Sequence, residues 1–149
     1  MATEKTIWDF LKSKSLTDFA AAGIMGNLQA ESNLRSNNLE DTRNATLGSD
    51  EVYTKNVDNG RYTRSSFIND GAGYGLAQWT TKDRKSGLYD YCKTQGKSIS
   101  DITCQLEYLY KELKEMNLLA AMNTAQSVRA ASDIFLTRFE RPRDQGESV

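Results

Sequence analysis

Glu31 carries the clearest catalytic signal in the sequence, because a carboxylate there ends an apolar helical stripe. Ala20, Ile24 and Leu28 lie at helical spacing, and the same stripe reaches Glu31 three residues later. A stripe that faces a core normally continues with an apolar side chain. Partial burial and the negative end of a helix dipole both favour the protonated form of a glutamate. We therefore predict that Glu31 is a general acid, the alternative being a solvated glutamate at a helix end.

A second stretch, residues 70–80, reads DGAGYGLAQWT and combines glycines with aromatic and amide side chains. Its glycines allow close approach of the backbone to a ligand. Aromatic faces and amides suit sugar rings, which have apolar faces and hydroxyl edges. The candidate binding residues are Tyr74, Gln78 and Trp79. The alternative is a glycine-rich turn that leads into an ordinary core tryptophan.

Taken together, GNLQAES, GYGLAQWT and the later FERP resemble the lysozyme-like domain of phage cell-wall lysins. Such domains occur in tail-associated proteins and endolysins of phages that infect Gram-positive bacteria. Goose-type lysozymes and lytic transglycosylases are more distantly similar, although this chain differs from them in having Ala77 and Trp79 around the glutamine. The resemblance runs from about residue 7 to residue 149. It implies that Glu31 is the catalytic glutamate and that Tyr74, Gln78 and Trp79 lie in the glycan cleft.

The resemblance implies hydrolysis of the β-1,4 bond between N-acetylmuramic acid and N-acetylglucosamine, without a metal or other cofactor. A lytic transglycosylase that leaves 1,6-anhydromuramic ends is the first alternative. A wall-binding phage module without turnover is the second. The expected partners are peptidoglycan glycan strands and other domains of a phage tail protein or endolysin. The expected location is the phage tail, or the cell wall after release from the host cytoplasm.

Any second catalytic carboxylate must come from the segment between the two motifs, because none lies within helical reach of Glu31. This segment carries Glu40, Asp41, Asp50, Glu51, Asp58 and Asp70. Of these, Asp70, Asp50, Glu51 and Asp41 are the candidates that we retain. A carboxylate across a cleft leaves space for a water molecule, which favours inversion at the anomeric carbon.

Composition places the chain among ordinary globular proteins. Its 149 residues favour one domain over 1–149, with 38% hydrophobic and 26% charged residues. A net charge of −1 provides no basic surface for nucleic acid or an anionic membrane. The apolar runs are too short to cross a bilayer, and the polar N-terminus is unlike a signal peptide.

The absence of histidine from the sequence excludes histidine-based triads, histidine-ligated zinc and histidine general bases. The two cysteines, Cys92 and Cys104, are too few for a site in which cysteines alone bind zinc. They would form one disulfide or remain small buried side chains, and we expect the second for a protein made in a reducing cytosol. Acid–base chemistry must therefore come mainly from carboxylates.

Patterning predicts a mainly α, lysozyme-like (α+β) fold with one small β-hairpin. The hairpin is expected from strands 51–56 and 61–67 around Asn59-Gly60, a pair that favours a type I′ turn, and it would form a wall of the cleft. Within the Glu31 helix, Gly23 and Gly26 are expected to allow close packing. Near the end, Glu140 and Arg141 are expected to pair beside Pro142. The expected helices are 4–13, from 18 through Glu31, 81–94, 101–116, 118–122 and 128–139, with Thr17 and Ser127 as the N-caps of the second and the last. Residues 36–49 are polar and lack periodicity, so we expect a loop there.

Overall fold

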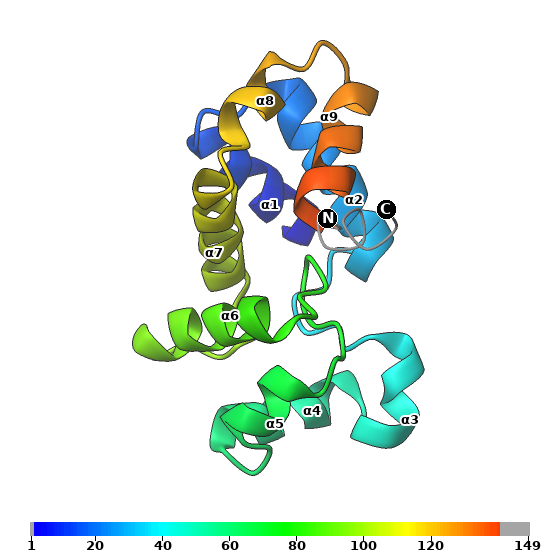
Figure 1. Ribbon diagram of the computed structural model, residues 1–149, viewed down its shortest axis with the longest axis vertical. Coiled ribbons are helices and arrows are strands. Elements are labelled where there is room, and N and C mark those ends of the chain that lie inside the picture. The colour runs from blue at the N-terminus through cyan, green and yellow to red at the C-terminus, as the bar shows by residue number, and fades with distance from the viewer. Residues whose placement is uncertain (1, 141–149) are drawn as a thin grey trace. The chain divides into compact units, whose positions relative to one another are not determined.

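The computed structural model describes residues 2–140, and this part of the chain is mainly helical (Figure 1). This confirms the mainly α prediction. Helix bounds agree with the predicted ranges to within two residues over much of the chain. The helices are α1 (Ala2–Ser13), α2 (Asp18–Ser32), α3 (Asn44–Leu47), α4 (Asp50–Asn59), α5 (Arg64–Asn69), α6 (Lys82–Thr94), α7 (Ile102–Glu115), α8 (Leu119–Thr124) and α9 (Val128–Ile134), with a 3₁₀ turn at Asp41–Arg43 and a π-helical segment at Phe135–Glu140.

The chain divides into two compact units. Among the described residues, the terminal unit comprises residues 2–30 and 109–140, and the central unit comprises residues 31–108. Helix α2 begins in the terminal unit, and its last two residues, Glu31 and Ser32, belong to the central unit. The prediction of a single domain over 1–149 stays a prediction.

The terminal unit is built on the stripe of α2 that the sequence predicts. Ala20, Ile24 and Leu28 are fully buried. Gly23 allows α9 to approach α2 closely, since a Cβ at that position would lie 2.7 Å from the Ser132 amide nitrogen. Asn27 Nδ2 reinforces this contact by donating to the Ser132 carbonyl oxygen at 3.1 Å. The packing role predicted for Gly23 is confirmed, but the same prediction for Gly26 is wrong, because nothing lies within 4 Å of a Cβ there.

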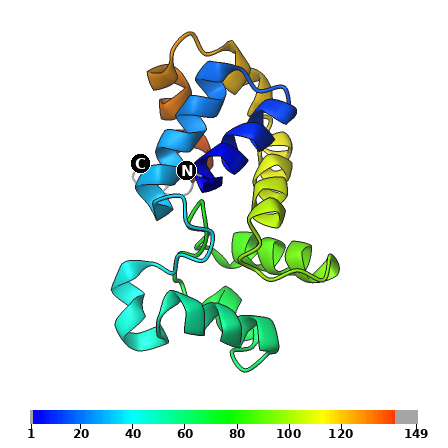
Figure 2. The same ribbon diagram turned by 180° about the vertical axis from the view of Figure 1, so that it is seen from behind.

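The central unit holds α3 to α6 and the first residues of α7. Helix α5 packs on α6, and the chain after α6 doubles back along that helix to reach α7 (Figure 2). A cluster of aromatic rings forms the core where α4 and α5 meet the glycine-rich loop. Tyr53 and Phe67 pack against Tyr74 with ring centroids 5.6 and 5.9 Å away, respectively. This core positions the loop.

The predicted β-hairpin is absent, because its first strand, 51–56, lies in α4 and residues 64–67 of its second strand lie in α5. Helix α4 begins after Ser49, whose side chain accepts a hydrogen bond from the Val52 amide. Tyr53 and Val57 then bury one helical face. Gly60, with φ +85°, stops α4 by donating from its amide to the Val57 carbonyl. A left-handed glycine suits a helix C-terminus as well as a type I′ turn, so Asn59-Gly60 does not distinguish them.

Other local predictions also need correction or lie outside the described residues. The stretch 36–49, expected to be a loop, contains the 3₁₀ turn and the single-turn helix α3. Arg141 and Pro142 lie outside the described residues, and so does the ion pair predicted for Glu140 with Arg141. Cys92 and Cys104 are buried and free, which agrees with the expectation for these two residues. Within residues 2–140 we find no helix with the length and apolar character of a membrane-spanning segment.

Candidate active site around Glu31 and the glycine-rich loop

Glu31 is the penultimate residue of α2, and its side chain is half-buried. The next residue, Ser32, is buried and ties this helix end to the glycine-rich loop. Its hydroxyl donates a hydrogen bond of 2.8 Å to the Leu76 carbonyl oxygen. Because Glu31 and Ser32 are adjacent on the last turn of a helix, this bond brings the backbone of Glu31 close to the loop. The two motifs that the sequence singled out therefore meet in the central unit.

The glycine-rich loop is a tight turn closed by paired backbone hydrogen bonds. Tyr74 and Trp79 exchange two such bonds, each of 3.0 Å. Tyr74 also forms a β-bridge with Leu39. Within residues 2–140, β-pairing consists of these isolated bridges, which lie outside the predicted hairpin strands 51–56 and 61–67. The loop is thus fixed by its own backbone and by the segment that follows α2.

A buried glutamine supports the loop from the side of α7. Gln105 Oε1 accepts a hydrogen bond of 2.9 Å from the Leu76 amide, and its Nε2 donates to the Ser36 and Ile99 carbonyl oxygens. Gly75 lets the loop approach this side chain, since its φ is +83° and a Cβ there would lie 2.8 Å from Gln105 Nε2. Sequence reasoning missed Gln105, because a glutamine within an apolar helix pattern gives no local indication of what it binds.

The three predicted binding residues differ in their exposure. Tyr74 and Trp79 are fully buried, and their rings belong to the core of the central unit. Gln78 is half-buried, and its Nε2 donates to the Asn38 and Gly75 carbonyl oxygens at 2.8 and 3.1 Å. The burial of both rings argues against their stacking on a sugar ring in this conformation, so their role in binding stays a prediction.

Asp70, a candidate second carboxylate, lies in a buried ionic network. Lys85 has no exposed surface, and its Nζ donates to Asp70 Oδ1 at 2.6 Å and to the Ala72 carbonyl oxygen at 2.7 Å. The hydroxyls of Tyr53 and Tyr62 donate to Asp70 Oδ2 at 2.6 and 2.9 Å. This network anchors the start of the glycine-rich loop. Sequence reasoning missed Lys85, because its partner lies fifteen residues earlier on another element.

The electrostatics of this network favour an ionised Asp70. Burial by itself would raise the pKa of this carboxyl, but hydrogen bonds from Lys85, Tyr53 and the Ala72 amide outweigh burial and hold the pKa below its ordinary value. Burial, followed by the hydrogen bond to the Asp70 carboxylate, raises the pKa values of Tyr53 and Tyr62. Lys85 Nζ also lies 4.1 Å from the centroid of the Phe67 ring, a favourable cation–π contact.

The other three candidate carboxylates occupy different environments. Asp50 is buried, forms an ion pair with Arg35 and accepts hydrogen bonds from the Leu39 amide and Asn44 Nδ2. Glu51 and Asp41 are exposed. In the part of the chain that the structure describes, His, Cys, Asp and Glu side chains do not gather in threes that would hold a metal ion.

The site therefore joins a half-buried glutamate at a helix end to a glycine-rich loop that is fixed by backbone hydrogen bonds. Residues 2–148 match the phage tail lysozyme family. The chain belongs to the phage tail lysozyme family. By membership of this family, the chain has a lysozyme-like, peptidoglycan-degrading function. It is a phage-associated protein that acts on the bacterial cell wall. No solved structure matches the chain significantly.

Proposed function

We propose that this phage tail lysozyme is an N-acetylmuramidase in which Glu31 is the general acid. The observation that supports the proposal is the 2.8 Å hydrogen bond from Ser32 to the Leu76 carbonyl, which holds the half-buried Glu31 near the glycine-rich loop. A rigid loop beside a partly desolvated acid provides the fixed geometry that proton transfer needs. The protein acts either from the phage tail or after release from the host cytoplasm.

In the proposed reaction, Glu31 donates its proton to the glycosidic oxygen between N-acetylmuramic acid and N-acetylglucosamine. The carbon–oxygen bond breaks and leaves an oxocarbenium-like muramic ring. Water attacks the anomeric carbon from the opposite face and gives a proton to a carboxylate base or to solvent, so the configuration inverts. General acid catalysis contributes roughly 10²–10⁴-fold to such a reaction, and preorganised polar groups around the cleft supply more.

We expect backbone groups and exposed carboxylates together to position the water that attacks the anomeric carbon. This follows from the environments of the candidate bases. Asp70 and Asp50 hold several hydrogen bonds each, so their replacement is expected to disturb the fold before it reports on catalysis. Glu51→Gln and Asp41→Asn should disturb the fold least, because both side chains are exposed. We expect at most one of the four carboxylates to matter strongly, and to matter less than Glu31.

The deciding experiment is Glu31→Gln, which keeps the shape of the side chain and removes the donated proton. Turnover of purified Gram-positive peptidoglycan should fall by roughly 10²-fold or more, with an unchanged melting temperature. Glu115→Gln is the matched control, since Glu115 is an exposed glutamate at the end of another helix. Wall clearance by Glu31→Gln at the wild-type rate would remove Glu31 from the mechanism and favour a different acid.

Mass spectrometry of the released muropeptides distinguishes the enzyme classes. Reducing muramic ends support the muramidase, whereas 1,6-anhydromuramic ends as the main product support the transglycosylase, in which the muramic C6 hydroxyl replaces water. A trapped glycosyl–enzyme adduct would indicate retention rather than inversion. Wall binding without any released product would support the non-catalytic module.

The proposed binding roles of the loop residues need variants that respect their burial. Gln78→Ala should weaken the binding of chitooligosaccharides, because it releases the loop from Asn38. Tyr74→Phe is preferred to Tyr74→Ala, since removing a fully buried ring would cost about 3–5 kcal/mol of stability. Trp79 is tested by the change of its fluorescence on titration. Wild-type affinity in both variants would remove Tyr74 and Gln78 from the site.

A further inference from the structure

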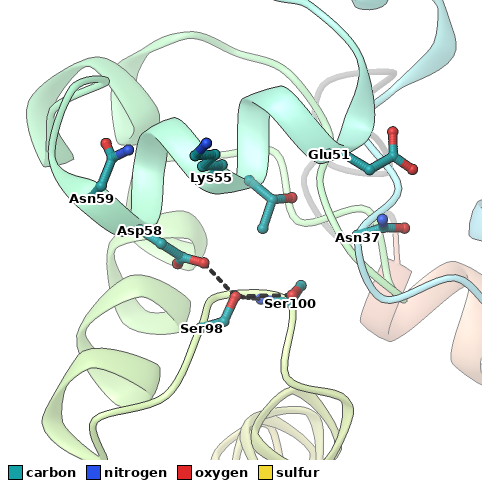
Figure 3. A pocket seen from close by; sticks show the side chains of 8 residues that line it. Asn37, Glu51, Lys55, Asp58, Asn59, Ser98 and Ser100 are labelled. Carbon is teal, nitrogen blue, oxygen red and sulfur yellow. Dashed lines mark hydrogen bonds between the residues drawn. The ribbon is translucent and has the colours of Figure 1, made fainter.

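A pocket of about 550 Å³ opens in the central unit between α4 and the loop that precedes α7 (Figure 3). One polar face of α4 supplies five of its lining residues, at helical spacing. They are Glu51, Thr54, Lys55, Asp58 and Asn59. The volume is within the range of about 300–1,000 Å³ for small-molecule sites. This face is separate from the buried face of the same helix, which carries Tyr53 and Val57.

The wall opposite α4 is fixed by Asp58. Its carboxylate accepts a hydrogen bond from the Ser98 hydroxyl and one of 3.0 Å from the Ile99 amide, and it pairs with Lys93 at 3.5 Å. Figure 3 shows the first of these bonds crossing from α4 to the loop. Because the Asp58 charge is already balanced, this residue shapes the pocket rather than leaving a charge for a ligand.

Glu51 and Lys55 are the charges that remain available in this pocket. Both are exposed, and neither side chain forms an ion pair or hydrogen bond with another residue in the described part of the chain. They stand one helical turn apart on the same face of α4 and have opposite signs. Among the described residues that line the pocket, none is aromatic, so the lining offers no face on which a sugar ring would stack.

We propose that this pocket binds the peptide stem of peptidoglycan, with Lys55 receiving a stem carboxylate and Glu51 a free stem amine. This inference rests on the proposed function, since it names the part of the same substrate that lies beside the cleaved glycan. From Glu51 to Asn59, α4 extends about 12 Å at 1.5 Å per residue. A peptide of three to four residues in extended conformation covers about the same length. The pocket thus complements an uncrosslinked stem in both length and charge.

The test is titration of the whole chain with a synthetic stem tetrapeptide, followed by amide chemical shifts in NMR. The tetrapeptide carries a free lysine amine and a C-terminal D-alanine carboxylate. Shifts should concentrate on residues 51–59 and 98–100. Lys55→Gln should weaken binding about tenfold, as expected for loss of one charge-assisted hydrogen bond. Lys82→Gln is the matched control, because Lys82 is exposed and outside the pocket.

Modified peptides identify which group each residue binds. Amidation of the D-alanine carboxylate should weaken binding to wild type but have little further effect in Lys55→Gln. Acetylation of the lysine amine should behave in the same way with Glu51→Gln. The proposal would be overturned if chitotetraose, and not the peptide, shifted the amide signals of residues 51–59 and 98–100. Equal binding of the peptide by wild type and Lys55→Gln would also overturn it.

The titration needs no turnover, so its outcome is independent of the reaction. Failure to bind peptide with active Glu31 would reject the pocket assignment and leave the muramidase proposal intact. The opposite outcome is that the wild-type chain binds the peptide and the Glu31→Gln variant still clears cell walls at the normal rate. That outcome would reject Glu31 as the acid and leave the pocket assignment intact.

Discussion

The Ser32 hydroxyl and the Leu76 carbonyl oxygen are joined by a 2.8 Å hydrogen bond between the end of α2 and the glycine-rich loop. Ser32 is 3% exposed and Leu76 is fully buried, so water competes little for this bond. It is the structural link between the residue predicted to donate the proton and the loop predicted to hold the glycan. Its loss should therefore affect activity more than folding.

Replacing Ser32 with alanine tests this link. The variant should lose about 1 kcal/mol of stability, the ordinary net value of a buried hydrogen bond. Turnover of peptidoglycan should fall by more than this loss of stability alone would cause. Thermal unfolding and muropeptide release measure the two effects. Ser65→Ala is the control, since Ser65 is exposed in the same unit. Activity that falls only in proportion to stability would make Ser32 a purely structural residue.

The Asp70–Lys85 pair is expected to dominate the stability of the central unit. Asp70→Asn leaves the fully buried Lys85 without its counter-ion and should cost about 3–5 kcal/mol of unfolding free energy. Denaturant titration measures this loss. Asp90→Asn breaks the exposed pair with Arg64 and should change the midpoint little. Similar midpoints for the two variants would mean that the buried network contributes no more than a surface pair.

The same network predicts how stability depends on pH. The folded pKa of Asp70 lies below its ordinary value of 3.8, so its contribution is present above that value. The contribution is lost as the pH falls through the lowered folded pKa. Melting temperatures measured from pH 6 down to pH 2 should drop steeply for the wild type at the acid end. The melting temperature of Asp70→Asn should be lower at pH 6 and should fall less steeply at the acid end.

Gly75→Ala should damage the loop because two costs coincide at this position. The backbone is left-handed, and the new Cβ would lie 2.8 Å from the buried Gln105 amide nitrogen. We expect a loss of about 2–3 kcal/mol of stability, together with reduced turnover. Gly71→Ala shares the positive φ but has open space, so it should cost about 1 kcal/mol. Equal losses in the two variants would show that backbone strain alone matters.

The cysteines should resist modification in the folded protein. Burial raises the pKa of the Cys92 thiol to about 12, so the reactive thiolate is scarce at pH 8. Labelling with a thiol reagent should be slow in native buffer and fast in denaturant. Rapid native labelling of Cys92 would mean that α6 opens locally far more often than its packing indicates.

Short-range patterns in the amino-acid sequence are sufficient to predict several features of this protein. The apolar stripe of α2 placed Glu31 half-buried at a helix end, because helical periodicity is a property of neighbouring residues. The motifs around Glu31 and Gln78 predicted the family to which the chain belongs. The caps at Thr17 and Ser127 were also readable, since each side chain accepts from the amide three residues later.

Features that depend on residues distant in the sequence could be recognised only in the folded chain. Asn59-Gly60 suits a hairpin or a helix end, and burial of Tyr53 and Val57 against the aromatic core selects the helix. Lys85 is one of three lysines in α6, and nothing in the sequence marks it as the partner of a buried carboxylate until folding brings it to Asp70. The charges that face the pocket are likewise unremarkable in sequence, since Glu51 and Lys55 become a site only when the loop at Ser98 closes the opposite wall. Charge pairing and burial are long-range outcomes of packing, which no local window of the sequence contains.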